Sequence, residues 1–174
     1  MSNWLNDLNR SNRCFCDLVW PVIGNYCGGG IIRPVEILRD NEIAADLDHL
    51  CGIDVWQRID GVGCRGIASR VQFGNRNWRT FTIRQARDSG GKTEYQKRME
   101  AIHSGGQFLY PYLTVQAYAD TTGKQLLGCA VASTDEIFKA ISDNRYTIRR
   151  TSNASFYVIK YEDVYKCNFA DFYL

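Results

Sequence analysis

Apolar and polar residues alternate in several stretches of the chain, and this period of two predicts β-strands. The alternating runs are bounded by turns rich in glycine, asparagine and aspartate, and they cover residues 53–59, 64–73, 78–85, 111–118, 125–132, 146–150 and 155–161. Many of their residues are β-branched or aromatic, as is typical of strands. The last two runs flank the short segment 151–154 and predict a β-hairpin.

Helices are predicted where apolar residues recur every three or four positions. In the segment 35–50, apolar positions 35, 38, 43, 47 and 50 share one face, with Pro34 in the first turn and Gly52 at the end. Thr93 is the expected N-cap of a helix over 93–103, and residues 133–136 open a short helix over 137–141. Residues 2–13 are expected to form a short helix or a frayed arm.

The order of these elements predicts a single α+β domain with a central mixed β-sheet flanked by helices. A chain of 174 residues is long enough for one hydrophobic core, and it contains no repeat, low-complexity segment or linker. We expect residues 1–174 to form one domain with a core over 35–132. Residues 1–34 would then form an N-terminal arm, and residues 145–174 a C-terminal hairpin and an aromatic tail packed on the body.

Composition narrows the cellular setting. No apolar run approaches the roughly 20 residues that cross a bilayer, and the N-terminus lacks the basic and apolar regions of a signal peptide. We therefore expect a cytoplasmic protein with no membrane partner. Seven cysteines at irregular spacing and only two histidines do not form a zinc pattern, and they are interpreted as free reduced thiols.

The net charge is only +2, but its distribution is uneven. Acidic residues are concentrated between positions 36 and 60, while arginines and lysines dominate the middle third of the chain. An acidic spot beside a basic field suits a metal site that meets phosphate. An ordinary solvated surface of mixed charge would give the same composition, so the charge distribution alone does not distinguish it from a metal site.

Asp54 follows Gly52 and Ile53 at the start of a predicted strand, and Glu94 and Lys97 lie in the helix after the next strands. Over roughly residues 35–132, this order resembles the core of the PD-(D/E)XK, or restriction-endonuclease-like, superfamily. In that family an acid opens the second core strand and a Glu/Asp-x-Lys triplet lies on the next strand. An acid from the preceding helix and a Lys or Gln from the following helix often complete the site.

The resemblance implies that Asp54 binds Mg²⁺ or Mn²⁺, because hard cations prefer oxygen ligands. The ion would activate a water for in-line attack on phosphorus. Glu42, or Asp46 on the same helix face, would supply the helical acid.

The chain departs from the family at the triplet, where residues 68–72 read Ala-Ser-Arg-Val-Gln and contain no acid. Arg70 stands for the lysine in one register and Gln72 in the other. Some family members carry the second acid on the following helix, where Glu94 lies, and Lys97 one turn later would offset charge on the phosphate. The resemblance thus implies catalytic roles for Asp54, Arg70, Gln72, Glu94 and Lys97, and metal-binding roles for Asp54, Glu94 and Glu42. In ordinary alternatives, Asp54 caps a turn, and Glu94 and Lys97 form an exposed ion pair.

Strand alternation places Thr80, Thr82 and Arg84 on one face of their strand, a polar face suited to phosphate contact or simply to solvent. The predicted nucleic-acid-binding residues are Arg79, Thr82, Arg84 and Arg98, and Gln116 is a further polar candidate at the cleft.

Three functions remain open from the sequence. The first is a divalent-metal-dependent nuclease of a phage or mobile element, acting on DNA rather than RNA, with a homodimer as one assembly to consider. The second is a non-catalytic nucleic-acid- or protein-binding module on the same fold, which the missing triplet acid favours. The third is an unrelated α+β interaction module, such as an inhibitor of a host enzyme.

Overall fold

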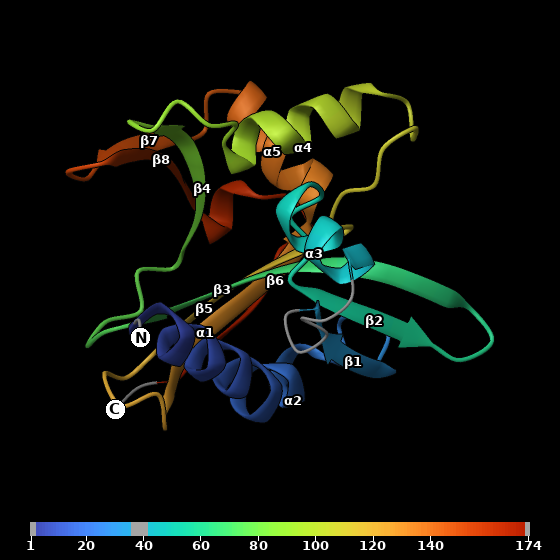
Figure 1. Ribbon diagram of the computed structural model, residues 1–174. Helices are drawn as coiled ribbons and strands as arrows, with labels where there is room; N and C mark the ends of the chain where they lie inside the picture. Colours follow the sequence, from blue (N-terminus) through green and yellow to red (C-terminus); the bar gives the residue numbers. More distant parts are fainter. Residues whose placement is uncertain (1–2, 36–41, 173–174) are drawn as a thin grey trace.

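Two β-sheets form the centre of the computed structural model, which describes residues 3–35 and 42–172 (Figure 1). The larger sheet has the strand order β1 (Ile31–Pro34), β2 (Val55–Ile59), β3 (Gly63–Phe73), β5 (Leu113–Ala119), β6 (Leu126–Ser133) and β9 (Asn168–Asp171). Its strands β3 and β5 are parallel and its other pairs are antiparallel. The smaller sheet is antiparallel, in the order β4 (Thr80–Arg87), β8 (Ala154–Lys160) and β7 (Thr147–Arg150).

One face of the larger sheet is covered by a continuous helical segment. It consists of α1 (Asn3–Cys14), a π-helical turn (Phe15–Val19) and α2 (Trp20–Ile23). Phe15, Val19 and Ile23 are almost fully buried and pack with Val55 and Val115 from the sheet. The described part of the predicted N-terminal arm therefore belongs to the core and also supplies the edge strand β1.

The opposite face of the larger sheet packs against the smaller sheet and α5 (Thr134–Ser142). This second core contains Tyr118 and Leu127 from the larger sheet, Phe81 and Ile159 from the smaller sheet, and Ile137 from α5. In Figure 1, α5 and α4 (Glu94–His103) lie above the larger sheet, beside the smaller one. A 3₁₀ turn (Tyr161–Asp163) leads from β8 toward the C-terminus.

The α+β fold predicted from the sequence is confirmed, and each predicted strand exists within about two residues of its expected bounds. Of the helix predicted over 35–50, the residues 42–49 form α3 (Glu42–His49), and residues 36–41 lie outside the described residues. The assignment of Pro34 to a helix was wrong, because Pro34 ends β1 opposite Val55. The edge position explains this, since proline has no N–H to donate to a ladder.

The predicted strand 78–85 is present as β4, but it does not join the larger sheet. Arg79, just before β4, has a positive φ of 53°, and β4 then pairs with β8. The predicted alternation is confirmed, because Phe81 and Ile83 are buried while Thr82 and Arg84 alternate with them. The polar face of β4 is thereby turned toward the larger sheet, where Thr82 bonds to Gln116.

The buried cysteines behave as small apolar residues. Burial raises the pKa of the Cys27 thiol to about 11 and that of Cys129 to about 12, and both pack in the core beneath the larger sheet. Thiols with raised pKa values are poor nucleophiles and metal ligands. Within residues 3–35 and 42–172, the helices are all too short or too polar to cross a bilayer.

Candidate functional site

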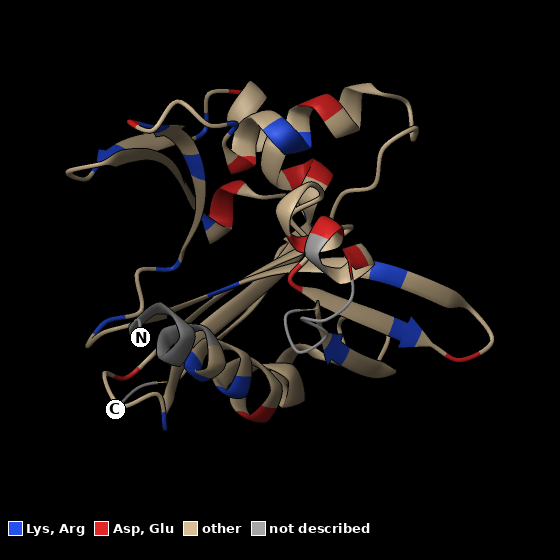
Figure 2. Cartoon of the chain, viewed as in Figure 1, with Lys and Arg blue, Asp and Glu red and all other residues tan. Residues whose placement is uncertain are grey.

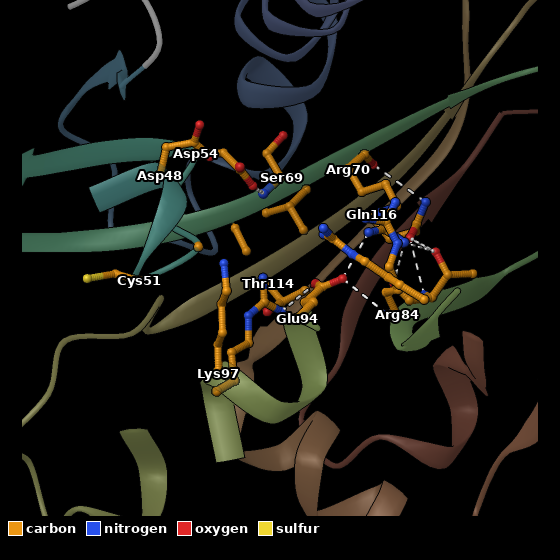
Figure 3. A pocket seen from close by; sticks show the side chains of 16 residues that line it. Asp48, Cys51, Asp54, Ser69, Arg70, Arg84, Glu94, Lys97, Thr114 and Gln116 are labelled. Carbon is orange, nitrogen blue, oxygen red and sulfur yellow. Dashed lines mark hydrogen bonds and ion pairs between the residues drawn. The ribbon is translucent and has the colours of Figure 1, made fainter. Parts of the chain in front are cut away.

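Residues far apart in the sequence meet in a cleft between the larger sheet, β4 and α4 (Figure 3). Its volume is about 270 Å³. The charged lining consists of the carboxylates Asp48, Asp54 and Glu94 and the cations Arg70, Arg84, Arg87, Lys97 and Arg98. Figure 2 shows acidic positions on α3, both acidic and basic positions on α4, and basic positions on β3 and β4. The excess of cations over carboxylates suits an anionic ligand.

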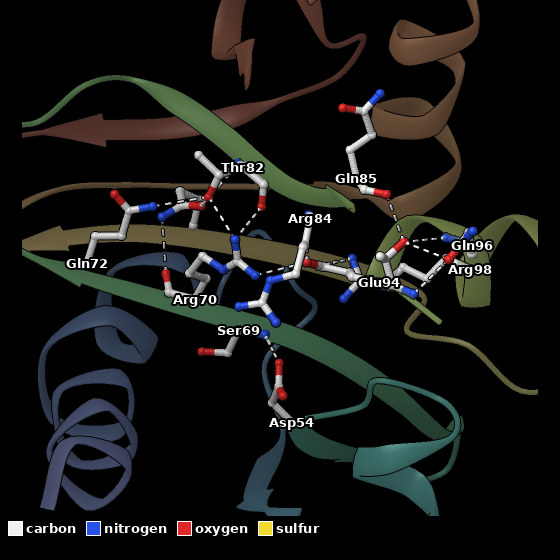
Figure 4. Close-up of polar contacts among 12 residues, drawn as sticks. Asp54, Ser69, Arg70, Gln72, Thr82, Arg84, Gln85, Glu94, Gln96 and Arg98 are labelled. Atoms are coloured by element: carbon white, nitrogen blue, oxygen red, sulfur yellow. Dashed lines mark hydrogen bonds and ion pairs between the residues drawn. The ribbon is translucent and has the colours of Figure 1, made fainter. Parts of the chain in front are cut away.

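Asp54 lies directly before β2 and points into the cleft. The following residue, Val55, is fully buried under the sheet with α1 and α2, so strand alternation turns Asp54 to the other side. The backbone N–H of Ser69 on β3 donates a 2.6 Å hydrogen bond to Asp54 Oδ2 (Figure 4). The sheet thus fixes one carboxylate oxygen of Asp54 at the wall of the cleft.

The surroundings of Asp54 favour its neutral form. Burial raises the pKa of this carboxyl to about 7. The hydrogen bond from Ser69 and the charge of Arg98 oppose the rise, while Asp48 and Glu94 add to it. A carboxyl with a pKa near neutrality in a charged cleft is typical of a functional group. A bound cation would favour its ionised form.

Asp48 is the acid that α3 contributes to the cleft. Asp48 is exposed on its outer side, but partial burial at the cleft wall raises its pKa, and the charges of His49 and Lys97 oppose that rise. The predicted helical acid, Glu42, lies at the other end of α3, is exposed and does not line the cleft. The sequence did carry a signal for Asp48, since it stands four residues before the helix-ending Gly52.

Glu94, the first residue of α4, has both carboxylate oxygens engaged. Arg70 binds Oε2 at 2.9 Å and Arg98 binds Oε1 at 2.8 Å. The backbone N–H of Arg84 donates a further hydrogen bond of 3.2 Å to Oε2. Burial would raise the pKa of Glu94, but these arginines outweigh it and hold the pKa below its ordinary value. Glu94 is therefore an ionised counterion that positions two arginines beside Asp54.

Glu94 pairs with Arg98, one full turn later on α4, and not with Lys97 as in the alternative interpretation of the sequence. Lys97 lines the cleft, and its Nζ donates a hydrogen bond to the backbone carbonyl of His49. Lys97 therefore connects α4 to the end of α3 on the side where Asp48 lies (Figure 3).

Two arginine nitrogens at the cleft lack partners. The Nε atoms of Arg84 and Arg98 are buried without a hydrogen bond in the described part of the chain. Burial, and then the charges of Arg87 and Arg70, lower the pKa of Arg84, which Glu94 opposes. An unpaired buried donor costs free energy, and an anion bound in the cleft would supply acceptors.

A hydrogen-bond network between the two sheets holds Arg70 in place. Its guanidinium donates to Thr82 O at 2.9 Å and to Thr82 Oγ1 at 3.1 Å (Figure 4). Gln72 Nε2 also donates to Thr82 Oγ1, and that hydroxyl donates to Gln116 Oε1 at 3.0 Å. Gln72 therefore supports Thr82 from outside the cleft lining, whereas Thr82 and the buried Gln116 line the cleft.

Arg79 lies elsewhere. Its guanidinium pairs with Glu162 and Asp171, at 3.1 Å each, and lies 4.7 Å from the ring centre of Phe169. The structure thus brings together Asp54, Arg70, Thr82, Arg84, Glu94, Lys97 and Arg98 from the predicted set, and it leaves Glu42, Gln72 and Arg79 outside the cleft lining.

The carboxylates of the cleft suit one hard cation whose remaining ligands come from water and from a bound phosphate. The described residues contain no group of three or more His, Cys, Asp or Glu side chains arranged around a metal position. Mg²⁺, however, is commonly held by one or two carboxylates, with waters and substrate phosphate completing its shell. Asp48 and Asp54 both line the cleft, so they are the two carboxylates from which such a site would be built, beside Glu94, whose oxygens are engaged by arginines.

Comparison of the chain with protein-family models, curated proteins and solved structures finds no match.

Proposed function

We propose that the cleft binds a nucleic-acid backbone and hydrolyses its phosphodiester bonds with a divalent cation, as a metal-dependent nuclease does. The main support is that Asp48 and Asp54 share one cleft with Arg84, Lys97 and the other cations. Carboxylates supply ligands for Mg²⁺ or Mn²⁺, and adjacent cations offset the charge of a phosphate. DNA is the substrate we expect.

The chain's own residues have distinct roles in this proposal. Asp54 and Asp48 would hold the ion, which supplies Lewis-acid activation of water when bound. Arg84 and Lys97 bind the phosphate, and Arg84 Nε gains the acceptor it lacks. Arg70 is positioned for the same phosphate by Glu94 and Thr82.

The positions of these residues also support a proposal that the chain is a divergent PD-(D/E)XK protein. Asp54 immediately precedes the second strand of the larger sheet, and Arg70 lies on the next strand. Glu94 and Lys97 lie on the helix that follows. This is the order that the sequence resemblance implies.

A second candidate is a non-catalytic nucleic-acid-binding protein that uses the same cleft. The observation that favours it is the full engagement of Glu94 by Arg70 and Arg98. With Glu94 serving as a counterion, the cleft has one fewer carboxylate to offer a metal.

The two candidates are separated by cleavage of labelled single- and double-stranded DNA and RNA with Mg²⁺, Mn²⁺ or EDTA. We expect metal-dependent cleavage that Asp54→Asn lowers roughly 100-fold or more, the scale of losing one group that stabilises a transition state. The matched control is Asp60→Asn at the β2–β3 turn, where the side chain is 80% exposed. Cleavage that survives EDTA or Asp54→Asn would rule out this site, and salt-sensitive binding without cleavage would support the second candidate.

A further inference from the structure

The smaller sheet presents an aromatic ring and several arginines beside the cleft. Phe156 on β8 is the register partner of both Arg84 on β4 and Arg149 on β7. Directly opposed residues on antiparallel strands project from the same face of a sheet. Arg84, Phe156 and Arg149 therefore form one row across all three strands.

This row lies on the face of the smaller sheet that points away from the core, and its member Arg84 lines the cleft. The neighbours of Phe156 and Arg84 in sequence, Tyr157 and Ile83, are buried in the core with α5. Alternation turns Arg84 and Phe156 to the opposite side, where Thr82 contacts the larger sheet. Arg149 lies on that side as well, because on β7 it is the register partner of Phe156.

Phe156 is half-buried and surrounded by cations. The guanidinium carbons of Arg70 and Arg84 lie 5.7 and 5.6 Å from its ring centre. Phe156 also lines a smaller pocket of about 240 Å³, whose other lining residues are Arg84, Arg87, Asp88, Ser89, Asn153 and Ala154. Arg84 and Arg87 line the main cleft too, so the two cavities adjoin through these arginines.

We propose that this smaller pocket, the stacking pocket, holds an unpaired nucleobase against Phe156, so that the ligand of the cleft is a single-stranded nucleic acid. The inference rests on the proposed function of the cleft and specifies its ligand. An aromatic ring beside guanidinium groups is a stacking platform for bases of any sequence. Arg84 and Arg87 contact the adjoining phosphate, while Ser89 and Asn153 offer polar groups to the base edge. A regular duplex keeps its bases paired and stacked inside and cannot present one to Phe156.

The test is fluorescence anisotropy in EDTA with two labelled single strands of equal length, and with a labelled DNA duplex of that length for comparison. One is a twelve-nucleotide oligothymidylate and the other has the same backbone with abasic sites in place of the bases. We expect Phe156→Leu, which keeps an apolar side chain, to weaken oligothymidylate binding roughly five- to 150-fold, the range for loss of one stacked base. Binding of the abasic strand changes less than about twofold, because phosphate contacts supply it. Phe156→Tyr retains the ring and binds like the wild type.

A second pair of variants tests the orientation of the row. Arg149→Ala removes a cation from the row beside Phe156, whereas Arg150→Ala removes the neighbouring cation on the opposite face of β7. We expect the first to weaken oligothymidylate binding several-fold more than the second. Equal losses would contradict the placement of the row.

The inference is overturned if wild-type protein binds the abasic strand as tightly as oligothymidylate, a comparison that requires no variant to fold. It is also overturned if Phe156→Leu affects both strands equally, or if duplex binds more tightly than single strand. Because EDTA prevents metal-dependent cleavage, base-dependent binding by a chain that never cleaves would refute the nuclease and keep the stacking pocket. Metal-dependent cleavage at the same rate in the wild type and in Phe156→Leu would support the nuclease and refute the stacking pocket.

Discussion

Asp54 combines a fixed position with a readily changed charge. One of its oxygens is held by the Ser69 N–H, while burial raises the pKa of the carboxyl to about 7. Near neutral pH the carboxyl is therefore poised between its protonated and ionised forms. The residue types at this site were predictable from sequence, since Asp54, Glu94 and Lys97 stand at recognisable places. Their contacts were not, because Glu94 pairs with Arg98 while Lys97 donates to the His49 carbonyl, and these partners depend on how the folded elements meet.

The raised pKa of Asp54 makes stability fall with increasing pH. The folded chain binds this proton more tightly than the unfolded chain, so stability is lost as pH rises from about 4 through about 7. Asp54→Asn keeps an acceptor for Ser69 and removes the titration. We expect the variant to be more stable than the wild type at pH 8, by at most about 4 kcal/mol for a three-unit shift, and the difference to shrink toward pH 4.

Urea unfolding of both chains over this pH range measures the effect, with Asp60→Asn as the exposed control. Curves for wild type and Asp54→Asn that run parallel between pH 4 and pH 8 would show that Asp54 titrates normally. An Asp54→Asn chain that remains folded also makes a loss of cleavage by this variant interpretable.

At the scale of secondary-structure elements, helix α4 connects β3 to the end of α3. It begins with a capping box in which Thr93 Oγ1 accepts from the Gln96 N–H and the Gln96 side chain accepts from the Thr93 N–H. This start was predictable because capping depends on residues three apart. From its first turns, Glu94 reaches β3 through Arg70, and Lys97 reaches the end of α3.

Glu94→Gln tests whether this helix carries a buried counterion. The change leaves Arg70 and Arg98 without their partner, and Arg98 is only 4% exposed, so we expect a loss of roughly 3–5 kcal/mol in the free energy of unfolding. The matched control is Glu100→Gln on the same helix. Glu100 pairs with Lys92, and both side chains are more than half exposed, so the expected loss is below about 1 kcal/mol. Similar losses in the two variants, measured by urea unfolding, would contradict a counterion role for Glu94.

Strands and helices were predictable because alternation and helical spacing are local patterns. Sheet membership was not, because it depends on distant partners. The local sequence places Pro34 in the first turn of a helix, whereas in the structure Pro34 pairs with Val55 on β2. Likewise, the local sequence of β4 does not show that its partner is β8, where Phe81 lies opposite Ile159, far along the chain. The helical acid was misplaced for a similar reason, since the end of α3 that approaches β2 carries Asp48.

At the scale of the whole molecule, the cleft arises where two sheets present polar faces to each other. Arg70 and Gln116 are register partners on β3 and β5 and therefore share one face of the larger sheet. Thr82 and Arg84 on β4 face them across the cleft. The same smaller sheet brings Phe156 beside the cleft, so one arrangement of layers supplies carboxylates, cations and an aromatic ring.

The central claim is that Asp48 and Asp54 together bind a divalent cation, and anomalous diffraction from crystals soaked in Mn²⁺ tests it most directly. The soak is made near pH 8, above the pKa of Asp54, so that both carboxyls can ionise. We predict a manganese peak in contact with both carboxylates, which is lost in crystals of Asp54→Asn. Wild-type crystals that show no peak at these carboxylates in saturating Mn²⁺ would contradict the account.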